Sequence, residues 1–147
     1  MLVRNRKARH EYTIETTVEA GLALTGSEVK SLRDAHASLT DAYAEERGGE
    51  LWLLEAQIDP YPYATYLNHE PRRPRKLLLH KAEIRRLATK VREKGLTLVP
   101  LEIYLKGSRI KVEIALARGR RQYEKRQAKR TEEARREVEA EEARRRR

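Results

Sequence analysis

The sequence predicts a mainly β fold with small helices, in which antiparallel strands form a small closed or partly closed barrel, followed by a basic C-terminal tail. Three observations predict it. Apolar and polar residues alternate along Tyr12–Val18, which is the period-two pattern of a half-buried strand. Gly48-Gly49 and Lys106-Gly107-Ser108 each separate two strand-like runs, as the turns of hairpins do. Residues 118–147 have almost no large apolar side chains, so the core must end before them.

The remaining strands are predicted from the runs around these turns. They are the hairpin arms Asp41–Arg47, Glu50–Gln57, Leu96–Leu105 and Arg109–Ala117, and a short strand at Leu77–Leu79. The short strand follows a proline-rich loop, Pro60–Pro74. Short antiparallel strands with few helices are typical of an OB-like barrel, so this is the expected fold class. Periodicity leaves the order of the strands open.

Two segments depart from the strand pattern and predict helices. Ser27–Ala35 begins with a residue that caps helices, has Glu28 in its first turn, and places two apolar residues three apart. Lys81–Lys94 has apolar residues at the i, i+3, i+4 and i+7 positions of one helix face. Gly95 follows it as the expected helix terminator.

Charge locates the boundary between a barrel domain, residues 1–117, and a basic tail, residues 118–147. The tail carries 13 basic and 7 acidic residues, against 20 basic and 16 acidic residues in the rest of the chain. Its only apolar residues larger than alanine are Tyr123 and Val138. Such a segment cannot offset its ordering entropy, so we expect it to be disordered alone. Its composition favours helix, so we expect it to become helical when bound.

The composition points to a polyanionic partner. The 147 residues carry a net charge of +10, and a basic protein gains affinity for phosphates by releasing counterions. An anionic membrane surface would satisfy the charge equally well. However, no apolar run is long enough to cross a bilayer, and no signal-peptide core follows the basic N-terminus. The absence of cysteine excludes disulfides and thiolate metal sites, and it fits a cytoplasmic protein.

Two basic clusters in the barrel could contact a nucleic acid. One precedes the first strand and contains Arg4, Asn5, Arg6, Lys7, Arg9 and His10. The other runs from Arg72 to Lys94 and includes Arg75 and Lys76. Its loop is stiffened by prolines, so we expect the loop arginines to be held extended towards RNA. A solvated helix face with a basic loop before it is an equally weighted alternative.

Catalytic sites are not indicated. The four histidines have no close pairing, and there is no glycine-rich phosphate loop, nucleophile triad or compact acidic cluster. We therefore expect no enzymatic activity, no metal and no cofactor. A metal-dependent nuclease with carboxylates dispersed along the chain is the remaining enzymatic alternative.

Several motifs together resemble one family. They include Asn5–Tyr12, the segment Leu24–Arg33 with its GSEVKSLR run, Pro71–Lys81 with RRPRKLLLHK, Lys94–Leu101, and Lys111–Gly119. These motifs occur in the family's order and cover nearly all of residues 5–126. The sequence is similar to small protein B, the SsrA-binding protein of bacterial trans-translation.

The resemblance implies both a fold and a function. The fold is an OB-like barrel, in agreement with the strand pattern. Members of the family bind the tRNA-like domain of transfer-messenger RNA (tmRNA, or SsrA RNA) and deliver it with elongation factor Tu to stalled ribosomes. The expected partners are therefore tmRNA, the small-subunit ribosomal RNA and, through the RNA, elongation factor Tu. We expect a cytoplasmic monomer without membrane contact.

The resemblance also assigns residues. Family positions tied to RNA binding fall on Asn5, Glu19, Leu78 and Lys111, and Glu28, Lys30 and Arg33 lie in the GSEVKSLR motif. The full set of predicted tmRNA-binding residues is Asn5, Arg6, Lys7, Arg9, His10, Glu19, Glu28, Lys30, Arg33, Arg75, Lys76, Leu78, Lys111 and Arg118.

In the family, the tail enters the decoding centre and the empty mRNA channel. The predicted contacts of the tail with the decoding centre are Tyr123, Lys125 and Arg126. From the residues alone, Tyr123 could equally pack back on the barrel or stack on a base. Residues 131–147 receive no assigned contact. A structural ribosomal protein or an RNA chaperone with a basic barrel is the alternative function.

Overall fold

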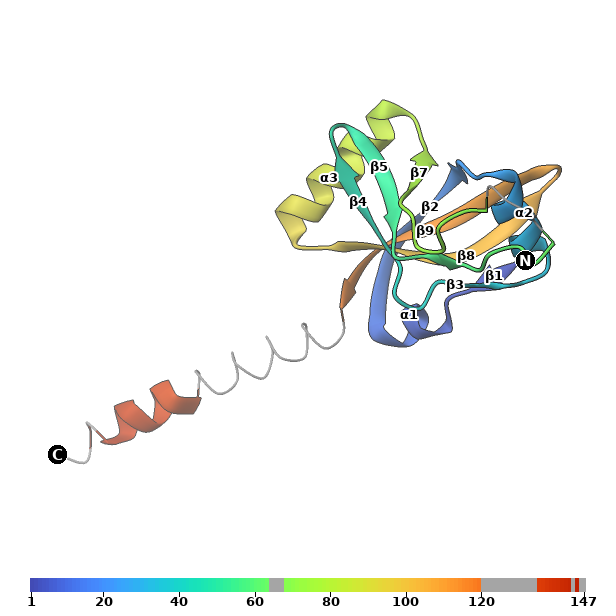
Figure 1. Ribbon diagram of the computed structural model, residues 1–147. Helices are drawn as coiled ribbons and strands as arrows, with labels where there is room; N and C mark the ends of the chain where they lie inside the picture. Colours follow the sequence, from blue (N-terminus) through green and yellow to red (C-terminus); the bar gives the residue numbers. More distant parts are fainter. Residues whose placement is uncertain (64–67, 120–134, 144, 146–147) are drawn as a thin grey trace.

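The computed structural model is a β barrel with three helices on its outside and at its end (Figure 1), and it describes residues 1–63, 68–119, 135–143 and 145. The elements in chain order are β1 (Val3–Arg4), α1 (Arg6–Glu11), β2 (Tyr12–Leu22), α2 (Gly26–Arg33), β3 (Ala37–Ser38), β4 (Tyr43–Arg47), β5 (Glu50–Leu54), β6 (Gln57–Ile58), β7 (Arg75–Leu78), α3 (Lys81–Lys94), β8 (Thr97–Lys106) and β9 (Arg109–Gly119).

The main sheet closes on itself. Its strand order is β1-β8-β4-β5-β7-β2-β9, and β9 also pairs with β8, so the two ends of the sheet meet. Every pairing is antiparallel. Closure leaves few free strand edges. The predicted antiparallel barrel is confirmed, and both predicted hairpins, β4–β5 and β8–β9, lie on its wall.

Irregularities in the two long strands change which face of the sheet each side chain occupies. The pairing of β2 with β9 shifts between Ile14 and Thr16, and that of β8 with β9 shifts between Pro100 and Glu102. An extra residue of this kind bends a strand and reverses its alternation. Ile14 therefore packs outside the barrel, whereas Val18 farther along the same strand packs against the core inside it. The simple alternation predicted for Tyr12–Val18 missed this reversal.

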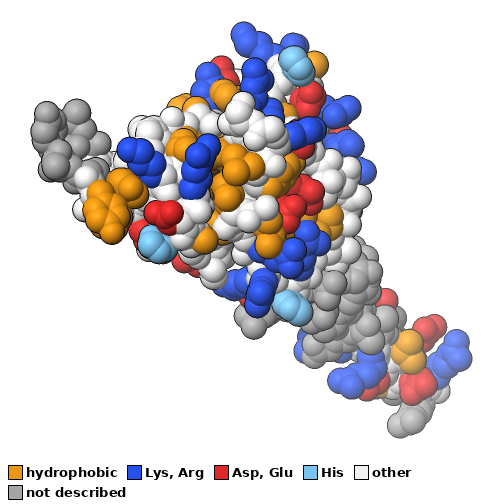
Figure 2. All heavy atoms as spheres, turned by 90° about the vertical axis from the view of Figure 1, so that its right-hand side faces the viewer, with side chains coloured by type: hydrophobic (Ala, Val, Ile, Leu, Met, Phe, Trp, Pro, Cys, Tyr) orange, Lys and Arg blue, Asp and Glu red, His pale blue; other side chains and the backbone are white. Residues whose placement is uncertain are grey.

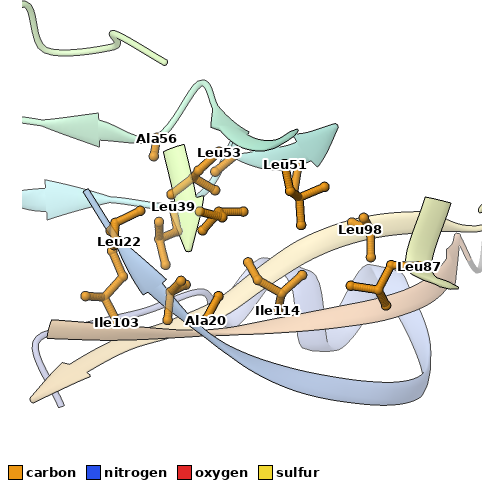
Figure 3. Packing of buried hydrophobic residues seen from close by; sticks show 14 of the residues in the cluster. Ala20, Leu22, Leu39, Leu51, Leu53, Ala56, Leu87, Leu98, Ile103 and Ile114 are labelled. Carbon is orange, nitrogen blue, oxygen red and sulfur yellow. The ribbon is translucent and has the colours of Figure 1, made fainter. Parts of the chain in front are cut away.

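The barrel interior is filled by aliphatic side chains from every wall (Figure 3). Leu51 and Leu53 from β5 and Ile103 from β8 are fully buried. Leu87 of α3 points into the cluster beside Leu98, so α3 covers one end of the barrel. Burying a leucine or isoleucine contributes about 1.5–3 kcal/mol. This core explains how the chain folds without any phenylalanine.

A second, smaller core lies on the outer face of β8 and β9. Ala8 of α1 packs there against Val99, Leu101, Ala115 and Ala117. The short helix α1 was not predicted, since its six residues contain one apolar side chain and no helical periodicity. It exists because its N-cap is anchored to the barrel and its alanine covers this apolar strip.

The predicted helices are confirmed with small changes at their ends. The N-cap of α2 is Thr25 and not Ser27. Thr25 Oγ1 accepts from the Glu28 N–H, and the Glu28 carboxylate accepts from the Thr25 N–H at 2.8 Å, which is a capping box. The α3 helix spans Lys81–Lys94 as predicted, and Gly95 ends it in the left-handed conformation at φ 63°.

The carboxylate of Glu28 also joins α2 to β7 and to the loop before it. Its oxygens accept from the Arg75 Nε at 2.6 Å and from the Arg73 guanidinium, whose Nε lies at 3.1 Å. The Arg75 guanidinium also donates to the carbonyls of Ala56 at 2.6 Å and Pro71 at 3.0 Å. Glu28 and Arg75 are both fully buried. Burial raises the pKa of Glu28, but the bonds from Arg73, Thr25 and Arg75 outweigh it and lower that pKa below 4.5.

The last barrel strand ends at Gly119, two residues beyond the expected domain boundary at Ala117. Gly119 pairs with Tyr12, so the tail leaves the barrel beside α1. Residues 135–143 and 145 are helical, in agreement with the helix-favouring composition of the tail.

Because the pKa of Glu28 is lowered in the folded state, the free energy of unfolding should decrease at acidic pH. The ionised pair stabilises the fold above the unfolded-state pKa, and this stabilisation is lost as pH falls through the lower folded-state pKa. At neutral pH, Glu28→Gln should cost about 3–5 kcal/mol, because it leaves Arg75 buried without its counter-charge. Between about pH 4.5 and the folded-state pKa, the free energy of unfolding should fall less steeply in Glu28→Gln than in the parent.

Urea unfolding at a series of pH values measures both effects. Glu93→Gln, on the exposed face of α3, is the matched control and should behave as the parent does. Parallel pH profiles for the parent and Glu28→Gln would contradict the role of this carboxylate.

Candidate nucleic-acid interface

A groove of about 540 Å³ runs over the outer face of three adjacent strands. Gly21 of β2 is paired with Leu78 of β7 on one side and with Lys111 of β9 on the other. The three residues therefore form a row across the sheet. Leu78 is 51% exposed, which is unusual for a leucine, and it has a cation two strands away. The row presents an apolar surface and a positive charge side by side.

Gly21 gives this arrangement room. A Cβ atom built at Gly21 would lie 3.1 Å from the Leu78 Cβ. A side chain there would require Leu78 to shift by a few tenths of an ångström. The glycine thus lets Leu78 lie close against β2.

A carboxylate is held at the edge of the groove. Glu19 lies two residues before Gly21 on the same face of β2 and lines the groove. Its carboxylate accepts a hydrogen bond from the Tyr104 hydroxyl, and the Lys106 ammonium lies 3.1 Å from its Oε1. These two bonds, that of Tyr104 first, lower the pKa of Glu19 below 4.5. Burial and the bond to Glu19 raise the pKa of the Tyr104 hydroxyl, so it remains a donor at neutral pH.

The groove gathers four of the residues predicted from the sequence. Glu19, Lys76, Leu78 and Lys111 all line it. Lys76 also forms an ion pair with Glu50, at 3.4 Å. Charge alone would not have selected Glu19 or Leu78, and both came from the family resemblance.

The N-terminal cations form a separate surface. Arg6, Lys7, Arg9 and His10 are exposed on α1, beside the first residue of β2. Gly21 lies at the other end of that strand, about 30 Å away at the usual rise per residue. Arg118 is near α1, and its guanidinium lies 3.4 Å from the Glu15 carboxylate.

The predicted cations of α2 are exposed as well. The Lys30 ammonium lies 5.3 Å from the centre of the Tyr61 ring, and Arg33 is exposed in the last turn of the helix. Figure 2 shows the side of the molecule that holds α2 and the β8–β9 turn. On it, lysine and arginine side chains surround an area of hydrophobic ones.

Three predicted residues are buried, and their polar atoms are used within the fold. The Asn5 amide donates to the carbonyls of Leu39 at 3.0 Å and Pro100 at 2.9 Å, and its oxygen accepts from the Ala8 N–H. Glu28 and Arg75 form the buried pair described above. In this structure these residues position α1, α2 and β7. The proline-rich loop does not hold Arg75 out towards solvent, because the carbonyls and Glu28 bind it from inside.

Some predictions lie outside the residues that the structure describes. These are the decoding-centre contacts of Tyr123, Lys125 and Arg126. One groove residue and the two partners that hold Glu19 were missed by reasoning from the sequence. Gly21, Tyr104 and Lys106 carry no local signal, since each acts through a partner on another strand. Gly21 lies beyond the strand predicted at Tyr12–Val18, so the pattern gave no reason to expect a close contact between strands there.

The described part of the chain offers no cluster of three or more acidic or histidine side chains that could hold a metal. His69 has a structural role, because its ring bonds to the Ser27 hydroxyl and the Ile58 carbonyl. No described helix is long and apolar enough to span a membrane.

A closed antiparallel barrel with cations around a groove on its outer face belongs to the class of OB-like barrels. Comparison with known proteins identifies the family within this class. The profile of the family described as SmpB protein matches residues 2–144, and the chain belongs to this family.

Individual relatives agree with the assignment. The chain is 56% identical over 138 residues to the SsrA-binding protein of Acidothermus cellulolyticus, covering 94% of this chain and 87% of that protein. It is 56% identical to the SsrA-binding protein of Thermobifida fusca, covering 94% and 86%. A solved structure described as "tmRNA-SmpB: a journey to the center of the bacterial ribosome" contains a similar chain. It has a TM-score of 0.67 and 54% identity, and the match covers 79% of this chain and 82% of that one.

The hydrogen bond from Tyr104 predicts that the pKa of Glu19 will change when this bond is removed, and titration can measure the change. Tyr104→Phe removes the donor, so the pKa of Glu19 should rise towards 4.5. Carboxyl carbon NMR as a function of pH reports this pKa directly. Tyr43→Phe, an exposed tyrosine on β4, serves as the control and should leave it unchanged. An unchanged titration of Glu19 in Tyr104→Phe would show that this bond does not hold the carboxylate in solution.

Proposed function

We propose that the barrel binds the tRNA-like domain of tmRNA in the groove between β7, β2 and β9, and delivers this RNA to stalled ribosomes for trans-translation. The observation that carries the proposal is the Leu78–Gly21–Lys111 row with Glu19 beside it. Membership of the SmpB family supports it, since the relatives are named SsrA-binding proteins.

The groove has the chemistry that unpaired RNA needs. An exposed leucine on a flat glycine offers apolar contact to an unstacked base. A fixed carboxylate with both its protein donors in place can accept a further bond from a base amino group or a ribose 2′-hydroxyl. Lys111 supplies the positive charge for a neighbouring phosphate. The cations of α1 and α2 add contacts that depend on charge more than on sequence.

The barrel and the tail are proposed to bind different RNAs. The barrel, residues 1–117 extended by two residues of β9, holds tmRNA. The tail enters the decoding centre and the empty mRNA channel through Tyr123, Lys125 and Arg126. Elongation factor Tu joins through the RNA, and the protein acts as a cytoplasmic monomer, away from membranes. It positions RNA and catalyses no reaction.

The role of Leu78 can be tested against a matched leucine. Leu78→Ala should weaken binding of tmRNA roughly fivefold or more, because about 1 kcal/mol of contact with a base is lost. Leu105→Ala is the control, since Leu105 is also exposed, at 40%, but does not line the groove. Filter binding with tmRNA and with an ordinary tRNA measures both the affinity and the preference. Equal losses in the two variants would place the RNA elsewhere, and equal parent affinity for the two RNAs would favour a generic basic protein.

Removal of the tail should separate binding from rescue. The truncation belongs after Gly119 and not after Ala117, because Gly119 still pairs with Tyr12. The barrel alone should bind tmRNA within about twofold of the full chain, whereas tagging on stalled ribosomes should be lost. The measurements are tmRNA affinity and tag addition in a reconstituted translation reaction. Loss of tmRNA binding on truncation would refute the proposed division of labour.

A further inference from the structure

The cations of the described barrel differ in whether a carboxylate lies within ion-pair distance. Several cations on strands and in the proline-rich loop have such a partner, for example Arg72 with Asp41 and Glu55, and Lys106 with Glu19. Among the described residues, Arg109 and Lys111 of β9 and the cations of α1 and α2 have no ion pair. Those on α3 have none within the described part of the chain. The α3 cations are Lys81, Arg85, Arg86, Lys90, Arg92 and Lys94. The helix thus concentrates unneutralised positive charge.

Helical spacing divides these cations between two flanks of α3. Arg85 and Arg92 line shallow depressions of about 250 and 170 Å³, shared with the Glu46 side of the β4–β5 hairpin. Arg86, Lys90 and Lys94 follow one another at intervals of four residues and form a straight row, with about 6 Å of rise between them. We call this row the open flank, because none of its members lines a depression with Glu46.

The open flank is electrostatically unfavourable within the protein itself. Arg86 with Lys90, and Lys90 with Lys94, are like-charge pairs at i and i+4, which destabilise a helix. Glu83 and Glu93 stand three residues from Arg86 and Lys90 but form no ion pair with them within the described residues, so the like charges of the row point to an external partner. That partner does not need apolar anchors, since no large apolar side chain of α3 is exposed. A protein interface normally supplies such anchors, whereas a phosphate backbone needs only charge.

The position of α3 identifies which polyanion fits. His80, Lys81 and Glu83, at the start of the helix, line the same groove as Leu78 and Lys111. The open flank begins one turn farther along the helix. An RNA held in the groove therefore meets this row as it leaves the groove.

We propose that the open flank of α3, formed by Arg86, Lys90 and Lys94, binds the phosphate backbone of the tmRNA whose unpaired region occupies the groove. This rests on the proposed function. The flank adds affinity without reading sequence, whereas Glu19 and Leu78 supply the discrimination. It makes α3 part of the RNA interface in addition to its role in closing the barrel.

The test compares two variants with equal loss of charge on the same helix. Arg86→Gln with Lys90→Gln removes two cations from the open flank, and Arg85→Gln with Arg92→Gln removes two from the opposite flank. Glutamine keeps a helix propensity close to that of lysine and arginine. Binding of full-length tmRNA is measured at several salt concentrations, and binding to ribosomes without tmRNA is measured in parallel. The open-flank variant should lower the slope of log affinity against log salt by about 1.5, the loss of two phosphate contacts.

The opposite-flank variant should lower that slope by much less. Equal reductions in the two variants would show an effect of net charge alone and overturn the proposal. No reduction in either variant would overturn it as well. A reduction confined to ribosomes without tmRNA would transfer the contact to ribosomal RNA and refute the assigned partner. Failure of the proposed function is distinguishable, because the parent protein would then bind tmRNA and ordinary tRNA alike.

Discussion

A single buried carboxylate fixes β7, the strand that carries Leu78, to the rest of the fold. Glu28 caps α2 and binds the guanidinium groups of Arg73 and Arg75, so the helix, the proline-rich loop and β7 are fixed to one another. Arg75 begins β7, and its position sets the register that places Leu78 opposite Gly21. A buried ion pair contributes little net stability when its desolvation is counted. Its value here is conformational, because a slip of β7 by one residue would turn Leu78 to the other face of the sheet.

The distinction between paired and unpaired cations explains why a charge count is a poor guide to the interface. The loop arginines were expected to be held extended towards RNA, yet Arg73 and Arg75 bind a carboxylate more than forty positions earlier in the chain. Their partner could not be found from local spacing. The cations of α3, which local reasoning treats as ordinary solvated residues, are among those that form no ion pair within the described part of the chain. The two groove residues to which the proposed function assigns discrimination between RNAs, Glu19 and Leu78, are not basic either.

Much of the fold could be predicted from the sequence. The elements that were not predicted all depend on contacts between residues that are far apart in the sequence. The hairpins and the helix Lys81–Lys94 are defined by contacts close in sequence, so their glycine turns and periodicity were sufficient. The helix α1 depends on Asn5, which reaches carbonyls 34 and 95 residues away, and nothing near Asn5 reveals them. The reversals within β2 and β8 likewise arise from closing the barrel. Leu78 of the groove was found through the family resemblance, whereas the role of Tyr104 as a donor to Glu19 could be found only once the strand order was known.

The pairing of β2 with β9 has a geometric consequence. Lys111 lies beside the groove, and Gly119, where the tail begins, lies eight residues farther along the same strand, with β2 alongside throughout. The separation between the two points, about 25–30 Å, is therefore set by a rigid pair of strands. A flexible linker would lose conformational entropy each time its two ends were held at a fixed distance. In this protein the conformational entropy of that segment is lost when the strands pair during folding. An RNA bound in the groove would therefore hold the start of the tail at a defined position without a further entropy cost.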